Sequence, residues 1–245
     1  MKKRRVTTVD VLAIGPHPDD VELTCGGTLA GCVRRGHRVG ILDLTRGEMG
    51  TRGTPATRAR EAARAARVLG VHHRENLGLP DAGLEPSMEQ KRALAARLRA
   101  LRPRVVILPH WKSRHPDHLN GSRLAYEACY LAGLKSIDLP GRPHRPFKIL
   151  YSTLYDESGR TQPTFVVDIT RDYHRRARAI ACYASQFRGP RLERGIYIPL
   201  TDIQEQMQVL CRYYGMLIGV RYGEPFLTRE ALQVDDVLEL PVRSL

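Results

Sequence analysis

The sequence lacks a hydrophobic run long enough to cross a membrane. No uninterrupted apolar stretch in its 245 residues approaches the roughly 18 to 20 residues that a spanning helix needs. Residues 1–15 begin with a basic cluster but reach the polar residues 7–10 before a short apolar run. This segment therefore lacks the longer apolar region and small-residue cleavage site of a signal peptide. We expect a cytoplasmic protein that does not act at a membrane.

Cysteine is scarce, odd in number and widely spaced. The five cysteines contain no CxxC pair and are Cys25, Cys32, Cys129, Cys182 and Cys211. This pattern argues against a disulfide framework and against a thiolate zinc site. We expect most of these cysteines to be small buried core residues.

Acidic residues are outnumbered, 26 against 39 lysines and arginines, which gives a net charge of +13. Such a charge raises the question of nucleic-acid binding, because clustered cations release counterions from phosphates. Here the basic residues are scattered along the whole chain, and local runs fall within helical patterns. We therefore expect no nucleic-acid partner, and a basic surface that helps to attract an anionic small substrate.

Repeats and low-complexity segments are also absent, and apolar runs alternate with helical patterns through the chain. This alternation predicts an α/β fold, a Rossmann-like and mainly parallel sheet flanked by helices, in a single domain over residues 1–245. The predicted strands cover residues 10–15, 38–45, 72–81, 104–111, 149–155 and 165–169. The predicted helices cover residues 21–36, 56–70, 88–103, 122–134, 171–187 (with Thr170 as its cap) and 202–215.

Two unusual polar clusters each follow a predicted strand. The first, PHPDD, covers residues 16–20, and the second, RHPDH, covers residues 114–118 after the most clearly buried strand. A single HPDD is more often a turn with an aspartate helix cap. Two such clusters at strand ends favour a shared site, because ligands of open α/β sheets bind beyond the carboxyl ends of the strands.

Histidine and carboxylate side chains suit a catalytic zinc ion, which keeps three protein ligands and an open position for water. His17 and Asp20 can reach one ion from a tight turn, and His118 is a suitable third ligand. Asp19 then remains beside the metal as a general base for the water.

The second cluster supplies two further candidate catalytic residues. We expect His115 to face the opposite side of a reacting carbonyl, where it can stabilise the oxyanion or protonate the leaving amine. Asp117 can hydrogen-bond His115 and fix its tautomer.

With these motifs, the chain resembles the LmbE-like (PIG-L-type) family of zinc-dependent N-acetylglucosamine deacetylases over nearly its whole length. The resemblance implies zinc as the cofactor, with Fe²⁺ as an alternative, and a homo-oligomer. It also implies the ligand set His17, Asp20 and His118 and the base Asp19. Arg58 matches the position of a family substrate-binding arginine.

Within the family, residues 182–187 (CYASQF) and 219–226 (GVRYGEPF) most resemble the bacillithiol-biosynthesis deacetylases. That resemblance implies removal of acetate from N-acetylglucosaminyl-malate. Arg58, with Arg46 and Arg52, can receive the malate carboxylates. The zinc motifs are shared with mycothiol-pathway deacetylases, so another N-acetylglucosamine conjugate, such as a mycothiol-type precursor or a chitooligosaccharide, is the alternative substrate.

Two other functions use the same residues differently. Two histidines and one carboxylate also form the facial triad of iron(II) oxygenases, although the α/β pattern and the spare Asp19 speak against it. A nucleotide-binding protein could use the glycines of CGGTLAG, residues 25–31, at a helix start. Because this is not GxGxxG, Gly26 and Gly27 are expected to be close-packing positions instead.

Overall fold

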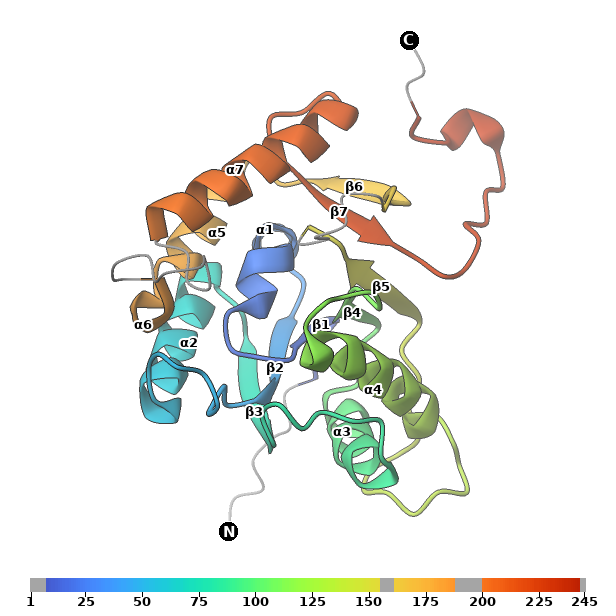
Figure 1. Cartoon of the computed structure of the whole chain (residues 1–245). Helices are drawn as coiled ribbons and strands as arrows, with labels where there is room; N and C mark the ends of the chain where they lie inside the picture. The colour runs from blue at the N-terminus through green and yellow to red at the C-terminus, as the bar shows by residue number, and fades with distance from the viewer. Residues whose placement is uncertain (1–7, 155–160, 188–199, 243–245) are drawn as a thin grey trace.

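Seven strands form one mixed sheet in the computed structural model, which describes residues 8–154, 161–187 and 200–242 (Figure 1). In chain order they are β1 (Val11–Gly15), β2 (Val39–Thr45), β3 (His73–Leu79), β4 (Val105–Pro109), β5 (Lys148–Ser152), β6 (Phe165–Asp168) and β7 (Gly223–Leu227). The order across the sheet is β3-β2-β1-β4-β5-β7-β6. β1 to β5 are parallel, whereas β7 is antiparallel to both of its neighbours. The predicted α/β fold with a mainly parallel sheet is confirmed.

Helices cover both faces of this sheet (Figure 1). They are α1 (Asp20–Arg34), α2 (Pro55–Leu69), α3 (Met88–Leu101), α4 (Pro116–Ala132), α5 (Tyr173–Ile180), α6 (Ala184–Phe187), α7 (Leu200–Leu217) and the short 3₁₀ turn Val237–Glu239. One core lies between the sheet and α3 and α4, and a second lies between the sheet and α1, α2 and α5. No helix among the described residues is long and apolar enough to cross a membrane.

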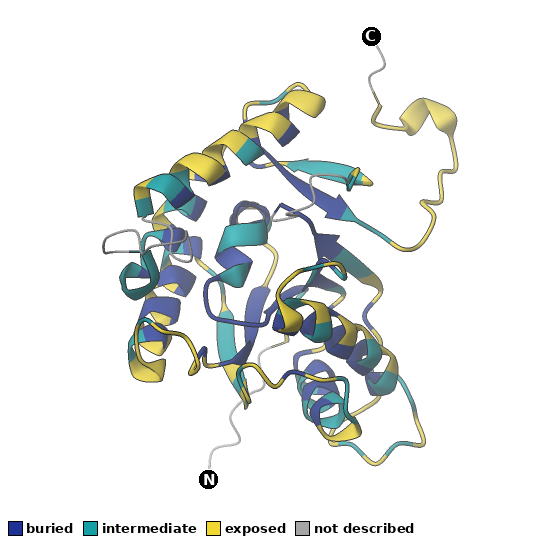
Figure 2. Cartoon of the chain, in the orientation of Figure 1, coloured by how far each residue is buried: buried dark blue, intermediate teal, exposed yellow. Residues whose placement is uncertain are grey.

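The helix α2 illustrates how the sequence produces these layers. Thr54 caps its start by accepting a hydrogen bond from the Thr57 N–H, and Gly70 ends it in a left-handed conformation. Ala62, Ala65 and Leu69 are buried against the sheet at helical spacing. Figure 2 shows this pattern, with the central strands and the inner helix faces buried, the edge strands β3 and β6 partly exposed, and the outer helix faces exposed.

The chain changes direction across the sheet between β1 and β4, which are neighbours although α1 to α3 separate them in sequence. Their register pairs Val11 with Val105 and Ala13 with Ile107, so both strands end at the same edge. This edge is the topological switch point, where open α/β sheets bind ligands. The loops carrying the two polar clusters therefore meet there.

A buried ion-pair network supports β1 to β3 beneath this edge. Arg74 donates two 2.9 Å hydrogen bonds to Asp43 and one 2.5 Å bond to Glu22, and the Tyr183 hydroxyl donates to Glu22 at 2.9 Å. Asp43 and Glu22 are almost fully buried. Two carboxylates in such surroundings depend on the guanidinium for compensation.

On the edge strand β3, Glu75 forms a second, more exposed ion pair. Arg97 donates to it from Nε at 2.8 Å and also from Nη2. Burial alone would raise the pKa of Glu75, but hydrogen bonds from His73 and Arg97 lower it to about 2. This carboxylate is therefore charged in the folded protein down to strongly acidic pH.

Two sequence-based helix boundaries differ from the structure. The helix predicted over 122–134 begins at Pro116, because His115 takes the N-cap position. The helix predicted over 171–187 is divided into α5 and α6, since Glu61 accepts hydrogen bonds from the Ser185 N–H and hydroxyl where α6 starts.

The capping role predicted for Thr170 is also wrong. Asp172 is the N-cap of α5, and the Thr170 hydroxyl instead accepts a hydrogen bond from the Tyr222 N–H. Residues 1–7, part of the segment compared with a signal peptide, and residue 155, the end of a predicted strand, lie outside the described residues.

Candidate metal and catalytic site

The first polar cluster turns sharply between β1 and α1. Asp19 is the N-cap of α1, with φ 120° and ψ −29°, and its side chain makes no capping hydrogen bond. A positive φ is costly for a residue other than glycine, and such strain is concentrated at functional sites. Asp20, the first residue of α1, accepts a 2.8 Å hydrogen bond from the His17 N–H at Oδ2. The turn therefore presents His17, Asp19 and Asp20 together.

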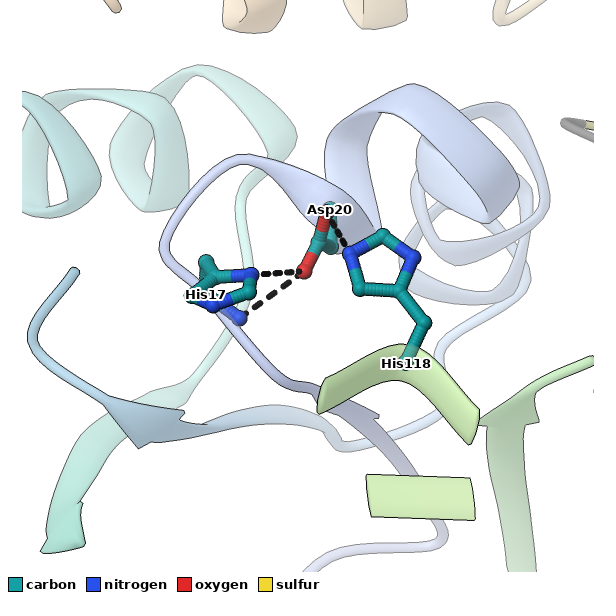
Figure 3. A group of neighbouring side chains, drawn as sticks. All are labelled: His17, Asp20 and His118. Atoms are coloured by element: carbon teal, nitrogen blue, oxygen red, sulfur yellow. Dashed lines mark hydrogen bonds and ion pairs between the residues drawn. The ribbon is translucent and has the colours of Figure 1, made fainter. Parts of the chain in front are cut away.

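The second cluster forms the start of α4. His115 is the N-cap, and its Nδ1 accepts a 3.2 Å hydrogen bond from the Asp117 N–H. His118 thus lies in the first turn of the helix, not in a loop before it. Its side chain projects toward the β1 loop (Figure 3).

The three predicted metal ligands converge from the turn before α1 and from the starts of α1 and α4. His17 and His118 lie on either side of the Asp20 carboxylate (Figure 3), with His17 Nδ1 3.2 Å from Oδ2 and His118 Nε2 3.3 Å from Oδ1. One ligand atom from each residue lies within 4.8 Å of the other two. Tetrahedral zinc with bonds of about 2.0–2.1 Å holds its donors about 3.4 Å apart. The donor spacing and chemistry fit a zinc ion.

Two carboxylates, which we call the acidic shell, lie beside His17, and this contact was not predicted from the sequence. Nε2 of His17 lies 2.9 Å from Asp81 Oδ1 and 3.4 Å from Asp117 Oδ2. With Nε2 held by Asp81, the Nδ1 atom of His17 is directed at Asp20. Carboxylates commonly orient metal-ligating imidazoles in this way, through the ring nitrogen that does not bind the metal. Asp81 follows the edge strand β3 in a turn, where an aspartate has no distinctive local signal.

Asp117 contacts His115 through its backbone, and its carboxylate contacts other groups. It accepts hydrogen bonds from the N–H groups of Ala82 and Leu84, at 2.8 and 3.3 Å. It therefore fixes the turn that carries Asp81 and faces His17, and the contact with His115 comes from its backbone N–H.

Arg58 lies beside the candidate base. Its Nη2 donates a 2.6 Å hydrogen bond to the Pro18 carbonyl and lies 3.2 Å from Asp19 Oδ1. The guanidinium occupies space left by Gly47, where a Cβ would lie 2.0 Å from Nη1. Arg58 is only 5% exposed, so it stands behind Asp19 and is not an open surface arginine.

The two other arginines expected to receive substrate carboxylates lie on the loop after β2. The Arg46 side chain is exposed and lies against Gly78, near the end of β3. The Arg52 carbonyl accepts a 2.8 Å hydrogen bond from Gln186, which ties this loop to α6. These contacts place Arg46 beside β3 and the Arg52 backbone beside α6.

Burial and neighbouring charges shift the titration of the site. Burial raises the pKa of Asp19 to about 7, against the opposing effect of Arg58. Burial disfavours the charged form of His17, yet Asp20 and Asp81 raise its pKa to about 11. Burial alone would raise the pKa of Asp20, but His118 and His17 hold it well below its usual range. The surplus of carboxylates around His17 favours a bound cation.

His115 lies at the exposed side of the cluster. Its ring centroid is 4.7 Å from that of His118 and 5.1 Å from that of His17. Burial, followed by the charges of His118 and His17, lowers the pKa of His115 below its usual value. An exposed imidazole next to the candidate ligands can contact a substrate and exchange a proton with it.

The glycine pair of α1 serves packing, as expected. A Cβ on Gly26 would lie 3.2 Å from Arg176, and one on Gly27 would lie 2.8 Å from Ile169. The N–H groups of Gly27 and Thr28 donate to the buried Glu224. These amides are already occupied, so they do not form a phosphate-binding loop.

Known proteins share both the sequence pattern and the fold. The sequence model of the PIG-L family, described as GlcNAc-PI de-N-acetylase, matches residues 12–129, which include every predicted site residue. A diacetylchitobiose deacetylase from Thermococcus kodakarensis is 30% identical over 87% of this chain and 80% of its own length.

Solved structures agree with this relationship. The conserved protein TT1542 from Thermus thermophilus has a TM-score of 0.83 at 42% identity, covering 93% of this chain and 98% of its own. The N,N'-diacetylchitobiose deacetylase from Pyrococcus horikoshii, complexed with its inhibitor MPG, has a TM-score of 0.74 at 30% identity and covers 88% of this chain and 82% of its own. This chain therefore belongs to the PIG-L family of deacetylases and is a hydrolase.

Proposed function

We propose that this protein is a zinc-dependent hydrolase that removes the N-acetyl group from an N-acetylglucosamine conjugate. The observation that carries the proposal is the convergence of His17, Asp20 and His118 within 4.8 Å, with Asp19 adjacent in the same turn. Fe²⁺ accepts the same donor set and is the alternative metal. An oxygenase triad would leave Asp19 and Arg58 without a task, whereas amide hydrolysis uses both.

His17, Asp20 and His118 would hold the metal, and Asp81 would orient His17 through Nε2. When bound, zinc supplies a Lewis acid that polarises the acetyl carbonyl and makes water more acidic. Asp81 and Asp117 then balance the charge of the site from behind His17. This arrangement restricts the ligands to one orientation before substrate arrives.

Asp19 acts as the general base in this proposal. It is buried, its φ is 120°, and its side chain makes no capping hydrogen bond. The carboxylate is therefore not engaged by the helix start and can accept a proton from the attacking water. Arg58 positions Asp19 by its 3.2 Å contact and by its hydrogen bond to Pro18.

His115 acts on the opposite side of the reacting amide. Its Nδ1 is occupied by the Asp117 N–H, which leaves Nε2 as the atom available to the substrate. An Nε2–H can donate a hydrogen bond to the developing oxyanion, and a ring protonated at both nitrogens, which gives up the Asp117 N–H contact at Nδ1, can deliver a proton to the leaving amine. Both tasks are compatible with its exposed position.

N-acetylglucosaminyl-malate is the first substrate we propose, on the resemblance of residues 182–187 and 219–226 to bacillithiol-pathway deacetylases and on the basic surface of the chain. Diacetylchitobiose is the second candidate, because two relatives that share most of the chain carry that activity in their names. A mycothiol-type precursor is the third.

The experiment is acetate release by the zinc-loaded protein from each conjugate and from free N-acetylglucosamine. Preference for the malate conjugate supports the full proposal. Activity on only another conjugate retains zinc-dependent deacetylation and refutes the malate assignment. If the metal-loaded protein releases no acetate from any of them, the proposed reaction on these substrates is wrong.

A further inference from the structure

The last described segment of the chain, residues 229–242, extends away from the body (Figure 1). We call this segment the C-terminal arm. Every one of its residues is exposed, as Figure 2 shows. Six are large aliphatic residues: Leu232, Val234, Val237, Leu238, Leu240 and Val242. Soluble monomers rarely expose so many apolar side chains together, and such patches mark interaction sites.

Beyond residue 233, the described hydrogen bonds of the arm do not attach it to the body. The Glu230 carbonyl accepts a 2.9 Å hydrogen bond from the Thr228 hydroxyl, and the bonds described farther along join neighbours within the arm, such as Gln233 to Asp235 and the Leu238 N–H to Asp236. The base of the arm is anchored, because the Arg229 guanidinium lies over the rings of Trp111, Tyr126 and Tyr151 at 4.5–5.0 Å and residues 230–233 lie beside the body. The arm therefore has a fixed base and an uncovered apolar surface.

The arm also differs from the rest of the chain in charge. Residues 230–241 contain four acidic residues and no lysine or arginine, in a chain with a net charge of +13. The arm is thus an acidic and apolar segment on a basic protein. A basic and apolar groove would complement it.

Such a groove lies along the first half of β5. It has a volume of about 1080 Å³, and Lys148, Ile149 and Leu150 line it. β5 pairs with β7 only through Tyr151 and Ser152, so no strand among the described residues lies beside 148–150 on that side. An open strand edge of this kind can accept an added extended segment.

The side chains of this groove match the arm. Arg145 lies over the Tyr130 ring at 4.8 Å and Lys148 over the Phe147 ring at 5.9 Å. Tyr130 and Phe147 are 59% and 82% exposed. Aromatic faces are thus available for the aliphatic residues of the arm, with two cations beside them for its carboxylates.

We propose that the C-terminal arm of one copy of this chain binds the β5 groove of a second copy, and that the exchange is reciprocal. The arm cannot readily fill its own groove. Residues 230–233 already line one side of that groove, and the chain beyond them runs away from the body (Figure 1). Reciprocal exchange covers both arms and both strand edges in a symmetric assembly.

The test of the arm is the molecular mass in solution, measured by light scattering after size exclusion over a range of protein concentrations. The wild-type chain is expected to have at least twice its 27.6 kDa monomer mass. The double substitution Val237→Asp/Leu238→Asp is expected to give the monomer mass, and since these side chains are 82% and 87% exposed, the fold should persist. Val209→Asp/Met216→Asp, at exposed positions on α7, is the matched control and should leave the mass unchanged.

The groove is tested by reversing its charge with Arg145→Glu/Lys148→Glu, which is expected to give the monomer mass. Lys112→Glu/Lys135→Glu changes the net charge equally at other exposed positions and should leave the assembly intact.

Restoration of the assembly by adding Asp236→Lys/Glu239→Lys to the groove variant would show that arm and groove meet. A monomeric wild-type chain overturns the proposal, as does an assembly that survives the arm or the groove substitutions. A failure of the charge exchange to restore the assembly refutes the assigned pairing. None of these outcomes depends on the proposed deacetylase reaction.

Discussion

Replacing Asp81 tests whether the acidic shell behind His17 controls metal binding. The Asp81 carboxylate lies 2.9 Å from His17 Nε2 and accepts a 2.9 Å hydrogen bond from the Met49 N–H. Asp81→Ala removes the negative charge and the acceptor that fix the imidazole. Loss of such a partner commonly weakens metal binding 10- to 100-fold, about 1.4–2.8 kcal/mol. Asp81→Asn retains an acceptor without the charge, so we expect about 10-fold for it and about 100-fold for Asp81→Ala.

The assay is competition for zinc between the folded protein and a chromophoric chelator of known affinity. Asp138→Asn, at an exposed carboxylate in the loop after α4, is the control and should bind zinc like the wild type. Circular dichroism establishes that each variant is folded. Unchanged zinc affinity in folded Asp81→Ala would show that Asp81 does not orient a metal ligand, and would remove this residue from the proposed site.

Three further predictions concern the elements that support the site. Gly47→Ala should lower kcat/KM at least 10-fold, because the added Cβ would displace the Arg58 guanidinium. Gly36 also has a positive φ but no atom near an added Cβ, so the control Gly36→Ala should keep kcat/KM and lower the free energy of unfolding by only about 1 kcal/mol. Arg74→Met should lower the free energy of unfolding by about 3–5 kcal/mol in urea titrations, since it leaves two buried carboxylates uncompensated; a loss below 1 kcal/mol would refute this role. The pKa of Glu75 is lower in the folded protein, about 2, than its ordinary 4.5, so its stabilisation is present above pH 4.5 and is lost as pH falls toward 2. Because Glu75 is partly exposed, Glu75→Gln should remove only about 1 kcal/mol of the free energy of unfolding that depends on pH between 4.5 and 2. An unaltered dependence of the free energy of unfolding on pH would contradict this prediction.

Local patterns in the sequence predicted much of the fold. The apolar runs at β1 and β4 and the alanine face of α2 carry strong periodic signals, and each lies where it was expected. Boundaries set by capping were less predictable. The helix predicted to start at residue 122 begins six residues earlier, at Pro116, because proline is favoured in the first turn of a helix.

Some residues of the candidate site were predictable from the sequence, and others were not. His17, Asp20 and His118 were predictable because two unusual motifs follow two buried strands, and neighbouring parallel strands bring their ends together. Asp81 was not, since it comes from a third segment after an edge strand and approaches His17 only through tertiary structure. The exact partners of Asp117 depend likewise on the turn at residues 82–84.

The most direct test of the central claim is a paired measurement on Asp19→Asn and the wild-type protein. Zinc content and acetate release are measured on the same samples, with the best substrate of the wild type. We predict that the variant keeps full zinc occupancy, because Asp19 is not one of the three converging ligands, and loses about 10²- to 10⁴-fold in kcat. A zinc-loaded variant with near wild-type kcat would contradict the assignment of Asp19 as the base and the mechanism built on it.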